Sequence, residues 1–66
     1  MTAEEETRKI IAVESELAMA HPDVPPDRIK DAVKRSWMGY AHATIRDFVP
    51  LLVHREATAR LRGPYH

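Results

Sequence analysis

Apolar residues in the first third of the chain recur at helical spacing. Intervals of three and four residues place them on one stripe of a helix, and the stripe consists of Ile10, Val13, Leu17 and Ala20. Three consecutive glutamates, Glu4 to Glu6, precede it. They suit the first turn of a helix, whose positive dipole end favours anions. The pattern predicts a helix over residues 4–20.

Prolines separate this segment from a second one. The stretch from His21 to Pro26 holds three prolines, which break regular structure. Pro26 suits the first position of a helix, because its missing N–H would have no partner there. Gly39 is a suitable stop, since glycine adopts the left-handed conformation at low cost. Residues 26–39 are therefore predicted to form the second helix.

The third segment, residues 44–62, opens on Thr44-Ile45-Arg46-Asp47, a weak variant of the capping box. Pro50 would be about the sixth residue of this helix, beyond the turn that tolerates proline. We therefore expect the helix to be kinked or restarted near Pro50. No segment alternates apolar and polar residues as a strand would. The fold class predicted is an all-α three-helix bundle in a single domain, residues 1–66, with flexible tails at 1–3 and 64–66.

Six consecutive apolar residues, Phe48 to Val53, would cover the whole circumference of the third helix. Two short partner helices cannot cover every side of it, so a second chain is expected to do so. The residues predicted to form this interface are Phe48, Leu51, Val53, Trp37 and Ile11. A homodimer is the first expectation; another protein partner, or a kinked helix that uses both faces within one bundle, stays open. The predicted core consists of Ile10, Val13, Leu17, Ile29, Val33, Tyr40, Ile45, Phe48, Val49 and Leu52.

The amino-acid composition excludes several kinds of functional site. The chain has ten acidic residues, ten basic residues and no cysteine, which excludes disulfides, thiolate metal sites and cysteine nucleophiles. The four histidines are too far apart in sequence for a local zinc motif, and no nucleophile elbow or phosphate-binding loop is present. We expect a non-enzymatic protein without cofactor or metal. No apolar run is long enough to span a membrane, and the acidic start lacks a signal core, so a cytoplasmic location is expected.

The charges are unevenly spread along the chain. Residues 1–25 carry six acids and two bases, a net −4, whereas residues 26–66 carry four acids and eight bases, a net +4. A small DNA-binding helical regulator is therefore the alternative function, with phosphate contacts from Arg28, Lys30, Lys34 and Arg35. The chain contains neither Asn nor Gln, the usual readers of adenine. Nucleic acid therefore ranks below self-association as a partner.

The segment from Ile45 to Ala57, followed by Arg60-Leu61, resembles the hallmark segment of small actinobacterial three-helix-bundle dimerisation domains. These domains occur alone or N-terminal to arsenate reductases related to low-molecular-weight tyrosine phosphatases. Val24-Pro25-Pro26 also fits the start of the family's second helix, and the resemblance covers about residues 10–62. It implies a three-helix fold and self-association. It implies no activity, because those enzymes need a cysteine nucleophile.

Overall fold

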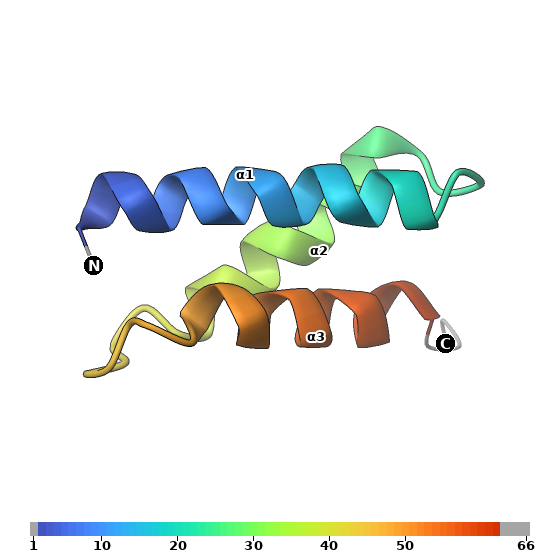
Figure 1. Ribbon diagram of the computed structural model, residues 1–66. Helices are drawn as coiled ribbons and strands as arrows, with labels where there is room; N and C mark the ends of the chain where they lie inside the picture. Colours follow the sequence, from blue (N-terminus) through green and yellow to red (C-terminus); the bar gives the residue numbers. More distant parts are fainter. Residues whose placement is uncertain (1, 63–66) are drawn as a thin grey trace.

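The computed structural model describes residues 2–62, which contain helices and no strand. The helices are α1 (Ala3–Ala20), α2 (Pro26–Met38) and α3 (Val49–Arg62). In Figure 1, α1 and α3 run in the same direction, and α2 crosses behind them. Each helix packs against the other two. The predicted all-α three-helix bundle is confirmed.

The start of α1 is capped by a residue that we assigned to a flexible tail. The Thr2 hydroxyl accepts a hydrogen bond from the Glu5 backbone N–H at 3.2 Å, which satisfies one of the donors that a helix start leaves unpaired. Ala3 is already helical. The remaining parts of the two predicted tails, residues 1 and 64–66, lie outside the described residues.

Both ends of α2 fall within one residue of the prediction. Pro26 is its first residue, as expected. Gly39 follows the last residue, but its φ of −63° is right-handed, so the expected left-handed stop is wrong. The chain instead leaves α2 through successive turns, in which Tyr40 N–H donates to Trp37 O at 3.0 Å and Ala41 N–H donates to Met38 O at 3.2 Å.

The third helix begins at Val49, five residues later than predicted. Its first turn is closed by a bond from Leu52 N–H to Phe48 O at 2.9 Å. Pro50 is thus the second residue of α3, where a missing N–H and the proline ring cost little. A helix that began at Thr44 would set the Pro50 ring against the carbonyl of Arg46. The predicted break near Pro50 is confirmed, but no helix precedes it over residues 44–48, and the capping box at Thr44 is wrong.

The core lies where the three helices meet. It consists of Ile10, Val13, Leu17, Ile29, Ala32, Val33, Val49, Val53 and Ala57. Two predicted core residues are exposed instead, Ile45 at 69% and Phe48 at 64%. They precede the true start of α3, so the helical register that we extended to them does not apply. Two others, Tyr40 and Leu52, are half-buried, and desolvation, followed by the nearby Glu56 carboxylate, raises the pKa of Tyr40.

Candidate functional site

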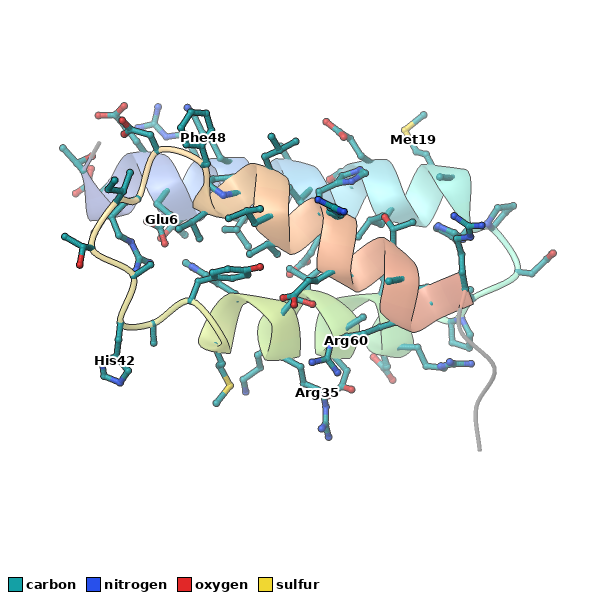
Figure 2. All side chains as sticks on the ribbon, turned by 90° about the horizontal axis from the view of Figure 1, so that it is seen from below. Glu6, Met19, Arg35, His42, Phe48 and Arg60 are labelled. Carbon is teal, nitrogen blue, oxygen red and sulfur yellow. The ribbon has the colours of Figure 1, made fainter. Side chains whose placement is uncertain are left out.

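A carboxylate is buried at the start of α1. The Glu6 residue is only 6% exposed. One of its oxygens accepts a hydrogen bond from Trp37 Nε1 at 2.7 Å and another from Arg46 Nη2 at 2.6 Å. The second oxygen accepts from Arg46 Nε at 2.9 Å, so the arginine holds the carboxylate with two parallel bonds. Figure 2 shows Glu6 inside the molecule, between α1 and the start of α3.

Arg46 also fixes the connection between α2 and α3. Its Nη1 donates to the carbonyl oxygen of Tyr40 at 2.6 Å and to that of Ala43 at 3.3 Å. The connecting segment has few backbone hydrogen bonds of its own, so these contacts set its path. One side chain from α1, one from α2 and one from the connection therefore meet in the Glu6–Trp37–Arg46 cluster.

The electrostatics of the cluster favour a permanent ion pair. The hydrogen bond from Arg46 lowers the pKa of Glu6, opposing the effect of burial, and the bond from Trp37 lowers the pKa further. The same pairing raises the pKa of Arg46. A carboxylate and a guanidinium that hold their charges this firmly are poorly suited to proton transfer near neutral pH. The cluster therefore serves to position the chain before α3.

Sequence analysis did not single out Glu6 or Arg46. We took Glu4 to Glu6 only as dipole-favoured residues of the first turn. A signal was present, because Glu6 lies four residues before Ile10 and so extends the buried stripe of α1. No comparable signal marks Arg46, which is forty residues from Glu6 in the chain.

Of the five residues predicted for an interface, three are exposed and two are not. Ile11, Phe48 and Leu51 are exposed, at 56%, 64% and 66%. Val53 is completely buried in the core, and this part of the prediction is wrong because α3 turns Val53 inward together with Val49. Trp37 is half-buried against the core, and its indole N–H is bonded to Glu6.

Met19 on α1, Phe48 just before α3 and Leu51 on α3 are exposed large apolar side chains. We call them the apolar face. Figure 2 shows Phe48 and Met19 along the same edge of the molecule, opposite α2. Leu51 precedes His54 by three residues on α3, so these two side chains lie on the same side of that helix. His54 Nε2 lies 3.4 Å from a Glu16 oxygen, and Met19 is one turn beyond Glu16. The apolar side chains thus flank this contact.

Ile11 lies elsewhere. It lines a shallow groove formed by the N-terminal half of α1 together with Ala3, Glu4, Thr7 and Arg8.

The basic residues proposed for DNA contacts lie on two flanks of α2. Arg28 and Arg35 line a groove that α2 forms with α3. Lys30 lines a different groove, which α2 forms with α1. Lys34 follows Lys30 by one turn and so belongs to the same flank.

Within residues 2–62, no three His, Asp or Glu side chains converge as a metal site would require. None of the helices in that range combines the length and the apolar character needed to cross a bilayer. No protein-family model, curated protein or solved structure matches the chain. The relation to actinobacterial dimerisation domains therefore stays a prediction from its residues.

Proposed function

We propose that this protein is a non-enzymatic self-association module that forms a homodimer through the apolar face. The observation that carries the proposal is the exposure of its three members: Met19 is 84% exposed, Phe48 64% and Leu51 66%. Single exposed apolar residues are ordinary on protein surfaces. Three large ones on one side of two neighbouring helices are typical of a surface that is covered by a partner.

The energetics are compatible with association. Burying a side chain of this size contributes about 2 kcal/mol, so six such side chains in a symmetric dimer contribute about 12 kcal/mol before costs. Each is already partly covered, which lowers the gain, and association itself costs several kcal/mol. We therefore expect a dimer whose population depends on concentration, rather than a permanent one.

The polar centre of the face limits how closely a second copy can pack. His54 Nε2 lies 3.4 Å from a Glu16 oxygen there, and the Glu16 side chain is 68% exposed. Covering that carboxylate would cost free energy unless the imidazole beside it were protonated. The two-fold arrangement would bring the same patch of both copies together.

The resemblance of residues 45–61 to actinobacterial dimerisation domains supports the same conclusion, and it implies neither a cofactor nor a catalytic residue. The DNA-binding alternative is less favoured. Its four basic residues lie on two flanks of α2, so they do not line a single helix face that could follow a phosphate backbone.

Sedimentation equilibrium across a concentration range tests the proposal. We expect the mass to approach twice the 7.6 kDa of one chain as concentration rises. Leu51→Glu should keep the protein monomeric, because it places a charge within the apolar face. Ile11→Glu is the matched control, since Ile11 is similarly exposed but lies in another groove. A wild-type protein that stays at one chain mass at high concentration would refute the dimer, and equal effects of both substitutions would refute the assigned face.

A further inference from the structure

A groove lies between α2 and α3. Its volume is about 610 Å³ and it is open to solvent, within the range of ordinary ligand sites. The residues that line it are Arg28, Asp31, Ala32, Arg35, Arg60 and Leu61. Three guanidinium groups and one carboxylate give it a net charge of +2, above an apolar floor of Ala32 and Leu61. Figure 2 shows Arg60 over α2 and Arg35 projecting from that helix.

The side chains are of the kind that recognises oxyanions. Arginine presents a planar fork of donors that matches a carboxylate or a phosphate. The Arg35 guanidinium is paired with Asp31 at 2.9 Å, but both side chains are more than half exposed. Such an exposed pair is weakly held and exchanges readily. Arg28 and Arg60 also interact with other groups of the protein, so a ligand has to compete for them and binding will be weak.

The distance between the arginines indicates what kind of ligand the groove can bind. Arg28 and Arg35 are seven residues apart, which places them about 10 Å apart along α2. A single small anion cannot reach both. An extended peptide covers about 3.3 Å per residue and points successive side chains to opposite faces. Acidic side chains four residues apart therefore lie on one face, about 13 Å apart, within reach of the two long arginine side chains. The residues between them would lie over Ala32 and Leu61. Asp31 disfavours a continuous run of phosphates, as in a nucleic acid, but is compatible with separated carboxylates.

We propose that the α2–α3 groove binds an extended acidic peptide segment of a partner protein, with two carboxylates four residues apart and an apolar side chain midway between them on the same face. The groove is separate from the apolar face, so this site and the homodimer are independent. A protein that binds itself through α1 and α3 would leave this groove available for a second partner.

The test is fluorescence anisotropy with a fluorescein-labelled peptide that contains Glu-Ala-Leu-Ala-Glu between glycines, at low salt. We expect saturable binding that weakens as salt is added, and a loss of about fivefold in affinity for either Arg35→Ala or Arg60→Ala. Lys34→Ala removes the same charge from the other flank of α2 and should bind as wild type does. A peptide with Gln in place of both Glu should not bind.

Three results would overturn the proposal. They are the absence of binding at millimolar protein, an equal loss for Lys34→Ala and Arg35→Ala, and tighter binding of a single-stranded DNA oligonucleotide that depends on the same arginines. Thermal melts followed by circular dichroism establish that the variants are folded. Leu51→Ser should leave peptide binding unchanged, so failure of the dimer and failure of this site are distinguishable.

Discussion

Replacing Glu6 by glutamine would remove the charge that joins α1, α2 and the segment before α3. The carboxylate now faces three donors: the Trp37 indole N–H and two N–H groups of Arg46. A glutamine side chain has one carbonyl oxygen and adds two donors, so at least one existing donor loses its acceptor and the new amide N–H faces another. A buried polar group without a partner costs about 1–3 kcal/mol.

We therefore expect Glu6→Gln to lower the free energy of unfolding by about 3 kcal/mol. A chain of this length has a total of roughly 3–10 kcal/mol, so the loss is a large part of its stability. The corresponding fall in melting temperature is about 15 °C. Glu4→Gln is the matched control, because Glu4 lies in the same helical turn but is exposed.

The effect should depend on pH with a definite sign. In the folded protein the pKa of Glu6 lies below its ordinary value of 4.5. Ionised Glu6 therefore contributes its full stabilisation above the unfolded pKa, and this contribution is lost as pH falls through the lower folded value. The difference in stability between wild type and Glu6→Gln should be constant near neutral pH and should shrink below about pH 5.

Urea unfolding at several pH values measures this difference. Trp37 is the single tryptophan of the chain and donates directly to Glu6, so its fluorescence reports the cluster itself. A Glu6→Gln protein no less stable than Glu4→Gln would refute the reasoning. So would a difference between wild type and Glu6→Gln that does not change between pH 7 and pH 3.

Three further substitutions test other parts of the fold. Val53→Ala should cost about 2 kcal/mol in urea unfolding, because Val53 is completely buried and the change leaves a cavity; a cost near zero would place Val53 outside the core. Ser36→Ala should be neutral or stabilising in the same assay, because the buried Ser36 hydroxyl has no hydrogen-bond partner; clear destabilisation would indicate one. Pro50→Ala should change helical circular dichroism little, because α3 already begins at Val49; a marked gain would show that proline alone prevents an earlier start.

Periodicity predicted α1 and α2 well because each has one buried stripe and a start that local chemistry favours. Pro26 at the first position of α2 is the clearest case. The third helix was harder to predict from periodicity. The run from Phe48 to Val53 is apolar on every side, so it contains no apolar stripe that would show which side of the helix faces the core. Only the structure shows that α3 begins at Val49, with Val53 turned inward and Leu51 left outside.

The candidate sites were only partly predictable from the sequence. Exposure of Leu51 followed from counting apolar residues on a short helix, and the structure bears it out. Phe48 was assigned to the core as well as to the interface, and its exposure contradicts the core assignment. The bond between Glu6 and Arg46 joins residues from different helical contexts, and neither local propensity nor spacing indicates such a pairing. The grouping of Arg28 and Arg35 with Arg60 likewise depends on how α2 packs against α3.

The pairing of Glu6 with Arg46 has a consequence for how the molecule can be divided. Most of the chain lies between these two residues in sequence, and Trp37, which also lies between them, belongs to the same hydrogen-bond network. A fragment that lacks the first few residues leaves Arg46 and Trp37 without their shared acceptor, and a fragment that ends before Arg46 leaves a buried carboxylate without a cation. Folding should therefore be all-or-none.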